Sequence, residues 1–428
     1  MNLTGKRLLV LGGGNSTYGV VECAKKMGLY IICVGQEQGG IAKDLADEAY
    51  CISTTDHEAL VALIKEKNID GVFTGASEFN IQNVIKVAHM AGLPCYCNED
   101  QWALMQDKRN YKDTCKKYGI PVVPEYPQDT DPADIVYPVI VKPTDGCSSK
   151  GVMLVKKAEE LPQAIAYAKE YSVCKEVIIE RFMDCKAIAA FYTVQDGVPS
   201  LSHIVDIFQY NNRDGIPTIT SVSLYPSNLL EAYLQKMDKK ICDMIKGIGL
   251  KNGVVSFQIF TENEEFYAFE CCLRISGNYD FPIIERINGI NYLEMMIEYA
   301  VTGSMGEKIV AQWSDPSFHG MYAANLVLML REGEIGSISG VEKVMEHKNI
   351  VAMNAPSFAV GSVIRPEYIG TLLQTFTRFH LVGEDFEDLK AAINYIFDTV
   401  QILDTNGNNM LYSQFDHAAL DAWKMQGK

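Results

Sequence analysis

A polar segment containing glycine lies between two apolar runs within residues 138–155, and it constrains the fold more than any other stretch of the chain. The apolar runs cover residues 139–141 and 152–155. Because β-branched and long apolar residues favour strands and the residues between them favour a loop, we expect a strand, a loop and a second strand. Backbone N–H groups, hydroxyls and an ammonium in one loop suit a small anion such as phosphate. A polar hairpin loop with an incidental lysine is the alternative.

The composition indicates a soluble globular protein. The length of 428 residues predicts roughly three domains, and 48% hydrophobic with 21% charged residues is a typical balance. No apolar run reaches the ~18 residues of a membrane span, and the N-terminus leads directly into a strand, so we expect a cytoplasmic protein. The twelve cysteines contain no Cys-x-x-Cys pair, which indicates reduced thiols. A net charge of −16 argues against a nucleic-acid partner.

The first hundred residues alternate between strand and helix patterns, which predicts an open parallel α/β unit. The expected strands are 6–11, 30–34, 49–52 and 71–74, and the expected helices are 18–27 and 56–67. Thr17 stands where the G-x-G-x-x-G pattern requires its last glycine, so the sequence does not support an NAD site. Glu78 follows a strand at the edge where such sheets bind ligands, and would line a substrate cleft or stabilise a helix N-terminus.

A second informative stretch is the predicted hairpin of residues 254–261 and 266–272. Gln258 and Glu270 are equally far from Glu264, so they should face each other across the two strands. Alternation along the strand puts Glu270, Cys272 and Arg274 on one face. An amide oxygen, a carboxylate and a guanidinium suit a triphosphate bound with Mg²⁺, and a cross-strand polar pair beside a surface arginine is the alternative.

The remaining patterns predict further helices and strands. The expected helices are 98–119, 158–171, 229–248, 284–302 and 385–403. The expected strands are 122–123, 177–183, 323–330, 361–364 and 377–383, with antiparallel runs over 187–225. Residues 331–336 look like a turn, and residues 339–348 fit either a strand or a helix.

The order of these features resembles the ATP-grasp superfamily, in its carboxylate–amine ligase, carbamoyl-phosphate-synthase-like and biotin-carboxylase-like branches. The shared features are an α/β preface, a lysine in the next helix, a strand ending in Lys-Pro before a Gly/Ser loop, an apolar strand ending in Glu, and a hairpin that closes on Glu270-Cys271-Cys272-Leu273-Arg274, where the superfamily has E-x-N-x-R. The resemblance covers nearly the whole chain. It implies an ATP-grasp fold of the α/β and α+β classes, with a Rossmann-like domain (1–97), an ATP-grasp domain (98–310, with lobes of about 122–183 and 184–310) and a small C-terminal α+β lobe (311–428).

The resemblance also implies the site residues. ATP would be bound by Lys108, Lys142, Ser148, Ser149, Lys150, Gly151, Glu180, Arg181, Phe182 and Met183. The lysines would contact the phosphates and the adenine side, the loop would close over the β- and γ-phosphates, and residues 180–183 would bind adenine, partly through the backbone of Arg181 and Met183. Gln258 and Glu270 would hold Mg²⁺, or alternatively Mn²⁺, and Arg274 would be catalytic.

The loop after Arg274 resembles the place where relatives hold an acceptor carboxylate. The backbone amides of Ser276, Gly277 and Asn278 would hold its oxygens, and a plain turn is the alternative. Two positions depart from the superfamily pattern. Ala187 replaces a glutamate that binds ribose, and Cys272 replaces the asparagine that binds a second Mg²⁺, for which a thiol is a poor ligand.

The resemblance implies an ATP- and Mg²⁺-dependent, ADP-forming ligase that activates a carboxylate as its acyl phosphate and joins it to an amine, such as an amino acid. Its partners would be a small carboxylate and a small amine, and it would form a homodimer. Two alternatives stay open. One is an enzyme that forms carbamoyl phosphate or carboxyphosphate from bicarbonate, and the other is a non-catalytic nucleotide-binding protein.

Overall fold

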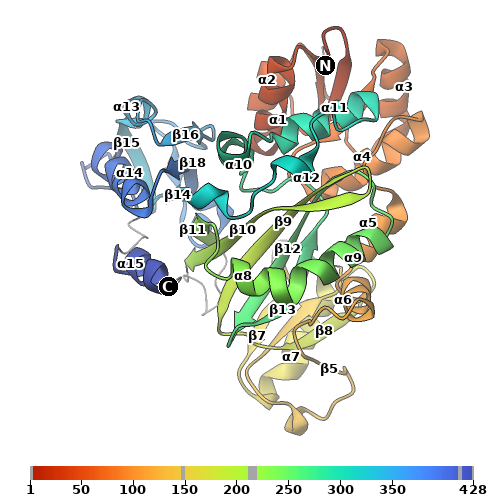
Figure 1. Ribbon diagram of the computed structural model, residues 1–428, viewed down its shortest axis with the longest axis vertical. Helices are drawn as coiled ribbons and strands as arrows, with labels where there is room; N and C mark the ends of the chain where they lie inside the picture. The colour runs from red at the N-terminus through yellow and green to blue at the C-terminus, as the bar shows by residue number, and fades with distance from the viewer. Residues whose placement is uncertain (1–2, 146–149, 211–218, 413–416, 427–428) are drawn as a thin grey trace.

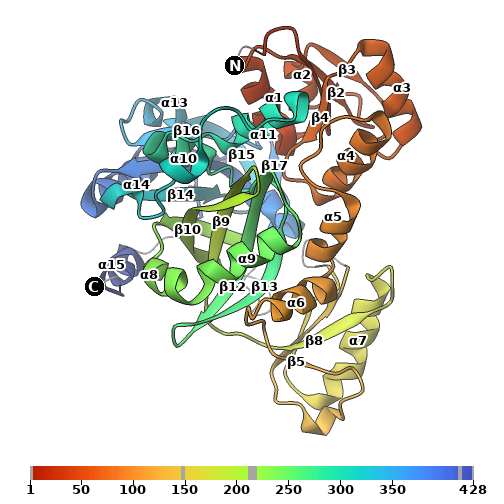
Figure 2. The same ribbon diagram turned by 45° about the vertical axis from the view of Figure 1, so that its right-hand side comes forward.

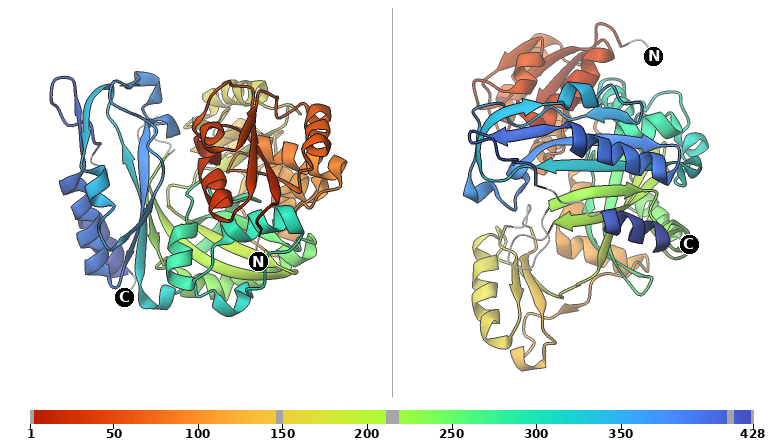
Figure 3. Two further views of the ribbon diagram at one scale, coloured as in Figure 1. Left: turned by 90° about the horizontal axis from the view of Figure 1, so that it is seen from above. Right: turned by 90° about the vertical axis from the view of Figure 1, so that its left-hand side faces the viewer.

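The chain folds into a mixed α/β structure in which the described strands form four sheets (Figure 1). This computed structural model describes residues 3–145, 150–210, 219–412 and 417–426. The N-terminal sheet and the C-terminal strands lie on either side of the centre of the molecule when it is seen from above (Figure 3). Among the described residues, no helix has the length and apolar character needed to cross a membrane.

The N-terminal sheet is the open parallel unit that the sequence predicts. Its order is β3-β2-β1-β4, and every pairing is parallel. Its strands are β1 (Arg7–Leu11), β2 (Tyr30–Val34), β3 (Glu48–Tyr50) and β4 (Gly71–Thr74), and its helices are α1 (Asn15–Lys26), α2 (Ile41–Leu45), α3 (His57–Lys67) and α4 (Glu78–Ala91). Because the strands are parallel, the turn after β1 and the start of α4 after β4 lie at the same edge.

Two helices connect this sheet to the next part of the chain (Figure 2). They are α5 (Glu99–Gln106) and α6 (Lys108–Lys117). The prediction of one helix over 98–119 is therefore wrong. Asp107 interrupts it because its side chain accepts hydrogen bonds from the amides of Arg109 and Asn110, which is the geometry of an N-cap.

An antiparallel sheet of order β5-β8-β6-β7 follows, and α7 packs against it. Its elements are β5 (Glu125–Tyr126), β6 (Val139–Pro143), β7 (Met153–Val155), β8 (Val177–Arg181), α7 (Leu161–Glu170) and the 3₁₀ turns η1 (Pro132–Asp134) and η2 (Ala158–Glu160). The two predicted strands of residues 138–155 are thus confirmed, and residues 146–149 of the predicted loop lie outside the described residues. The strand expected at 122–123 is reduced to a single bridge between Val122 and Ala268.

The largest sheet has eight strands in the order β13-β12-β9-β10-β11-β14-β18-β16. Its strands are β9 (Lys186–Gln195), β10 (Val198–Tyr210), β11 (Ile219–Tyr225), β12 (Gly253–Glu262), β13 (Glu265–Cys272), β14 (Tyr322–Met329), β16 (Ile350–Met353) and β18 (Thr375–Gly383). The predicted hairpin and the antiparallel runs over 187–225 are confirmed. The sheet combines strands from both sides of residue 311.

Several helices accompany this sheet. They are α8 (Leu230–Tyr233), the π-helical turn η3 (Leu234–Asp238), α9 (Lys239–Gly247), α10 (Phe281–Asn288), α11 (Tyr292–Thr302), α12 (Val310–Trp313) and the 3₁₀ turn η4 (Phe318–Gly320). The predicted helix 284–302 is two helices, because α10 ends on Gly289 at φ +65° and Asn291 caps α11.

The C-terminal segment adds a three-stranded sheet of order β17-β15-β19. The elements of this segment are β15 (Gly333–Ser339), α13 (Val341–Val344), β17 (Val363–Ile364), η5 (Pro366–Tyr368), η6 (Leu372–Gln374), α14 (Phe386–Thr399), β19 (Gln401–Asp404) and α15 (His417–Gln426). The predicted turn at 331–336 is therefore mostly strand, and the predicted helix 385–403 ends at Thr399. Asp385 caps α14 by accepting a hydrogen bond from the Asp388 amide.

Candidate active site

The polar loop of residues 144–151 joins β6 to β7, and Lys142 lies near the end of β6. Gly146, Ser148 and Ser149 lie outside the described residues, whereas Lys150 is exposed. Gly151 has φ +73°, and a Cβ built on it would lie 2.8 Å from Cβ of Tyr171. This position therefore requires glycine, both for its backbone conformation and for the close packing around it.

Lys142 contacts Glu180 across the β6–β8 pairing, inside the four-stranded sheet β5-β8-β6-β7, called the small sheet below. Its Nζ is 2.6 Å from one carboxylate oxygen of Glu180, and Nζ of Lys112 on α6 is 2.5 Å from the other. Burial alone would raise the pKa of Glu180, but the two ammonium groups outweigh it and hold this pKa below its ordinary value. Glu180 is therefore a buried carboxylate, already paired with two cations.

Lys112 is a site residue that the sequence reasoning missed. Its side chain is 2% exposed, and Nζ also contacts the Val123 carbonyl at 2.9 Å and Glu125 at 3.3 Å. The signal in the sequence was its position one helical turn after Lys108. Lys108 itself begins α6, and its amide donates to the Thr144 carbonyl at 3.1 Å, which joins the start of α6 to the residue after β6.

The segment after Glu180 differs in part from the expected adenine-binding hinge. The Arg181 amide donates to the Pro124 carbonyl at 2.9 Å, so this amide is already bonded within the chain. The Arg181 guanidinium contacts Glu262 at 2.7 Å and Sδ of Met183 at 2.8 Å. The half-buried Phe182 and the buried Met183 supply apolar surface beside it.

The β12–β13 hairpin has the predicted register. Gln258 lies directly opposite Glu270, and Ser256 lies opposite Cys272. Burial raises the pKa of the Cys272 thiol to about 11, and the charges that act on it include those of Arg274 and Glu270. Gln258, Glu270, Cys272 and Arg274 therefore form one cluster at the end of the hairpin.

Arg274 is held by Glu78, the first residue of α4. Nη2 and Nε of Arg274 donate to one carboxylate oxygen of Glu78 at 2.8 and 3.2 Å, and Nη1 donates to the Ile275 carbonyl at 3.0 Å. Burial opposes the charged guanidinium, but neighbouring negative charges, including Glu78 and Glu270, keep the pKa of Arg274 above its ordinary value. Glu78 thus lies at a helix N-terminus, one of the two roles considered for it, and it also contacts Arg274 from the N-terminal part of the chain.

Hydrogen bonds from buried polar side chains hold the loop of residues 276–280 in place. The Asn278 carbonyl accepts hydrogen bonds from Asn325 at 2.7 Å and from the His380 ring at 3.0 Å. Asp280 is fully buried and accepts hydrogen bonds from Asn325 at 2.9 Å and from the Tyr225 hydroxyl at 2.5 Å. This network fixes the path of the loop beyond Arg274.

The expected anion nest in this loop needs a correction. The Asn278 amide donates to Oγ of Ser276 at 3.0 Å, so this amide is already bonded inside the loop and cannot serve an acceptor carboxylate. Ser276 is buried, whereas Gly277 is exposed. Of the three predicted residues, Gly277 is the one that lines the adjacent cavity.

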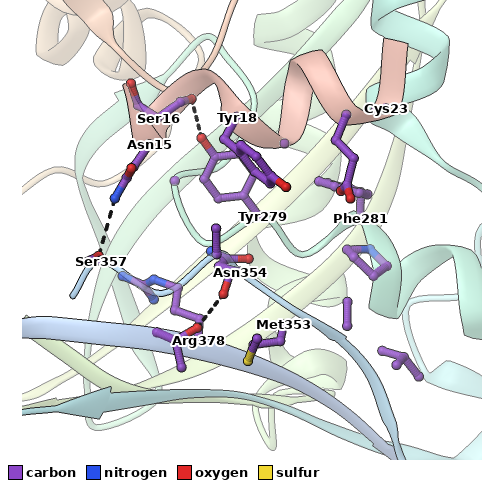
Figure 4. Close-up of a pocket in the computed structure, with 18 of the residues that line it drawn as sticks. Asn15, Ser16, Tyr18, Cys23, Tyr279, Phe281, Met353, Asn354, Ser357 and Arg378 are labelled. Carbon is purple, nitrogen blue, oxygen red and sulfur yellow. Dashed lines mark hydrogen bonds between the residues drawn. The ribbon is translucent and has the colours of Figure 1, made fainter. Parts of the chain in front are cut away.

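A cavity of about 560 Å³ lies between α1, the loop after Arg274 and the C-terminal strands. Figure 4 shows Arg378 of β18 on one side of it, with Asn15, Ser16 and Tyr18 of α1 on the opposite side and Tyr279 between them. The Arg378 guanidinium donates to Oδ1 of Asn278 at 3.2 Å, and among the described residues it has no carboxylate within ion-pair distance. No local pattern in the sequence predicts a role for Arg378, because its partners come from distant segments.

The candidate metal ligands are few. Among the described residues, no group of three or more His, Cys, Asp or Glu side chains is placed to hold a metal ion. Gln258 and Glu270 supply one amide oxygen and one carboxylate. This oxygen pair fits Mg²⁺ that takes its remaining ligands from water and nucleotide phosphates, whereas the buried Cys272 thiol does not suit it.

Comparisons with known proteins agree with this geometry. Residues 107–308 match the family described as carbamoyl-phosphate synthase L chain, ATP binding domain. The formate-dependent phosphoribosylglycinamide formyltransferase of Francisella tularensis subsp. novicida (strain U112) is 23% identical over 423 residues, which cover 92% of this chain and 99% of that protein.

Two solved structures have the same fold. The L-amino acid ligase from Bacillus licheniformis aligns with a TM-score of 0.74 at 18% identity, over 94% of this chain and 100% of its own. The biotin carboxylase domain of the Hydrogenobacter thermophilus 2-oxoglutarate carboxylase aligns with a TM-score of 0.76 at 18% identity, over 95% and 91% of the two chains. The predicted resemblance and fold class are confirmed.

Proposed function

Residues 107–308 match the family described as carbamoyl-phosphate synthase L chain, ATP binding domain, and from this match we propose that the chain is an ATP-dependent, ADP-forming ligase of the ATP-grasp type. It activates a carboxylate as an acyl phosphate and joins it to an amine. The relatives support this assignment, since one is named a formate-dependent formyltransferase and one an L-amino acid ligase.

The observation that carries the proposal is the place of Arg274. It follows the pair of Gln258 and Glu270 on the hairpin, and Gly277 and Tyr279 in the loop after it line the 560 Å³ cavity. A guanidinium between a metal-binding oxygen pair and a cavity can stabilise negative charge on a transferring phosphoryl group and on the acyl phosphate. Its bond to Glu78 holds the guanidinium in position before substrate arrives.

We place the nucleotide between the small sheet and the β12–β13 hairpin. Lys108, Lys142 and the loop ending in Lys150 and Gly151 would hold the phosphates, and the residues from Glu180 to Met183 would hold adenine. Gln258 and Glu270 would hold Mg²⁺, or Mn²⁺ in its place, which supplies charge neutralisation to the phosphates when bound. The chain itself orients the nucleotide and excludes water from the acyl phosphate.

The cavity is the proposed site of the second substrate. Arg378 lies on one side of it, and the first residues of α1, whose N-cap Gly14 provides no side chain, lie on the other. Both features favour an anionic group, such as the carboxylate of an amino acid, at their end of the cavity, whereas Glu22, Glu285 and Glu294 in the same lining favour a cationic group. The substrate would therefore keep one anionic group at Arg378 while its reacting group lies toward Arg274.

The test is ADP release by the purified chain with ATP, MgCl₂ and a panel of small carboxylates and amines. Arg274→Ala should lower turnover with the active pair by roughly 100-fold. Arg365→Ala is the matched control, because Arg365 is exposed and lies in the C-terminal segment. Unchanged ADP release by Arg274→Ala would rule out the catalytic assignment.

One further activity has support from the comparisons. The matched family is named after carbamoyl-phosphate synthase, and one structural neighbour is a biotin carboxylase domain in complex with bicarbonate. ATP turnover that depends on bicarbonate, with no organic acid present, would select carboxyphosphate chemistry. Tight ATP binding without turnover on any panel member would instead select a non-catalytic protein, which the thiol of Cys272 would explain.

We also propose that residue 97 ends a first domain, that residues 311–428 form a lobe that completes the ATP-grasp module of residues 98–310 through the shared eight-stranded sheet, and that the chain is a homodimer, since the biotin carboxylase neighbour is a dimer. Limited proteolysis and light scattering on the purified chain would test these points.

A further inference from the structure

Two cysteines separated by one residue lie between α4 and α5, outside the site described above. The chain bends at Tyr96 and Cys97, and Cys95 and Cys97 both line a cavity of about 590 Å³ that also contacts His89 and Lys251. Cys95 is half-buried and Cys97 is buried. Because both side chains line the same cavity, it gives small reagents a route to them.

Each of the two thiols shifts the pKa of the other. The hydrogen bond from Cys97 is the main reason that the pKa of Cys95 is lowered, and the amides of Cys97 and Tyr96 lower it further, although burial opposes them. The same contact raises the pKa of Cys97. Cys95 is thus the better nucleophile of the pair, and Cys97 is a second thiol within reach of it.

Tyr96, between the two cysteines, connects the pair to the active site. Its hydroxyl donates to the Leu273 carbonyl at 3.0 Å, and Leu273 immediately precedes Arg274. Glu78, at the other end of the segment 78–97, contacts Arg274 directly. The segment 78–97 therefore holds residues 273 and 274 from both of its ends.

We propose that Cys95 and Cys97 are a redox modification site, which closes to a disulfide on reaction with an oxidised low-molecular-weight thiol. The disulfide shifts Tyr96, and through the bond from Tyr96 to Leu273 it also shifts the adjacent Arg274. The Cys95 thiolate attacks one sulfur of the small disulfide, such as oxidised glutathione, and releases one thiolate. Cys97 then loses its proton and attacks Sγ of Cys95, which releases the second. Two protein thiols are oxidised and one small disulfide is reduced to two thiols.

The first test measures the modification alone. Trypsin cleavage at Lys86 and Lys108 gives a peptide, residues 87–108, that contains these two cysteines and no others. After treatment with oxidised glutathione, its mass should fall by two hydrogens in the wild type, and Cys97→Ser should instead retain glutathione on Cys95. Cys51→Ser, which removes an exposed cysteine elsewhere, should behave as the wild type. A peptide that stays reduced while Cys51 reacts would overturn the proposal.

The second test measures the coupling, and it rests on the proposed function. Oxidation should lower ATP turnover about tenfold or more in the wild type and leave Cys97→Ser within about twofold, and dithiothreitol should restore the wild type. Equal losses in the wild type and in Cys97→Ser would overturn the coupling. If no variant turns over ATP, the proposed function fails, while the peptide mass still decides whether the disulfide forms.

Discussion

At the scale of single residues, Glu180 shows what a motif predicts and what it leaves out. Its place near the end of an apolar strand predicts a carboxylate at the proposed nucleotide site. The pairing with Lys142 follows from two adjacent strands, but the pairing with Lys112 depends on how α6 packs on the small sheet. A buried carboxylate needs such partners, because an unpaired charge in the interior is strongly disfavoured.

Replacing Lys112 with Met should therefore destabilise the chain. The change leaves a buried carboxylate with one cation fewer, and we expect a loss of about 3 kcal/mol at pH 7, measured as a lower midpoint of urea unfolding. Lys116→Met is the matched control one helical turn away, since Lys116 is half-exposed and pairs with Glu125 at 2.9 Å. That variant should lose less than about 1 kcal/mol. Equal effects of both variants would show that burial of the pair does not matter.

The same pair predicts a pH dependence. The pKa of Glu180 is lower in the folded chain than the value of about 4.3 in an unfolded one. Its stabilising contribution is therefore present above about pH 4.3 and is lost as the pH falls through the folded pKa. Because Lys112→Met removes one of the cations that lower this pKa, its urea midpoint should begin to fall at a higher pH than that of the wild type.

At the scale of elements, local patterns predicted best where both partners are close in the sequence. The register of β12 and β13 follows from the short turn at Glu264, so the facing of Gln258 and Glu270 could be predicted. Asp107 and Gly289 are residue types that favour helix caps, but the apolar periodicity continues through both positions. The pattern therefore predicts one helix at each place where the chain forms two. The strand β15 was missed because it pairs only with β17 and β19, which lie far along the chain.

The loop between β6 and β7 gives a prediction for an element. Gly151→Ala puts a Cβ at φ +73° and 2.8 Å from Tyr171. We expect the free energy of unfolding to fall by about 1–2 kcal/mol from the backbone conformation alone, measured as a lower urea midpoint. ATP binding should also be weaker by calorimetry. Gly39→Ala is the control, because no described atom outside its chain neighbours lies within 4 Å of its Cβ. Similar behaviour of the two variants would show that Gly151 is not needed for the loop.

At the scale of the whole molecule, the cavity could not have been predicted. It joins residues of α1, the loop after Arg274 and the strands β16 and β18, which are hundreds of residues apart. Arg378 appears in the sequence as one cation within an apolar strand. Only the eight-stranded sheet, which continues from the hairpin to the C-terminal strands, brings it beside Asn278. The order of motifs thus predicts the proposed nucleotide side of the site, whereas the proposed second-substrate side depends on how the chain folds.

The contact between Glu78 and Arg274 joins the N-terminal sheet to the hairpin, and this link should matter for the chemical step. Glu78→Gln keeps the size and an acceptor oxygen but removes the charge that holds the guanidinium. We expect kcat to fall about tenfold or more, while KM for ATP stays within about twofold, because the assigned nucleotide contacts lie elsewhere. Glu58→Gln is the matched control, since Glu58 is an exposed carboxylate in the first turn of α3 in the same part of the chain. If steady-state kinetics show equal kcat values for the two variants, the N-terminal sheet does not position Arg274, and its role is confined to shaping the cavity.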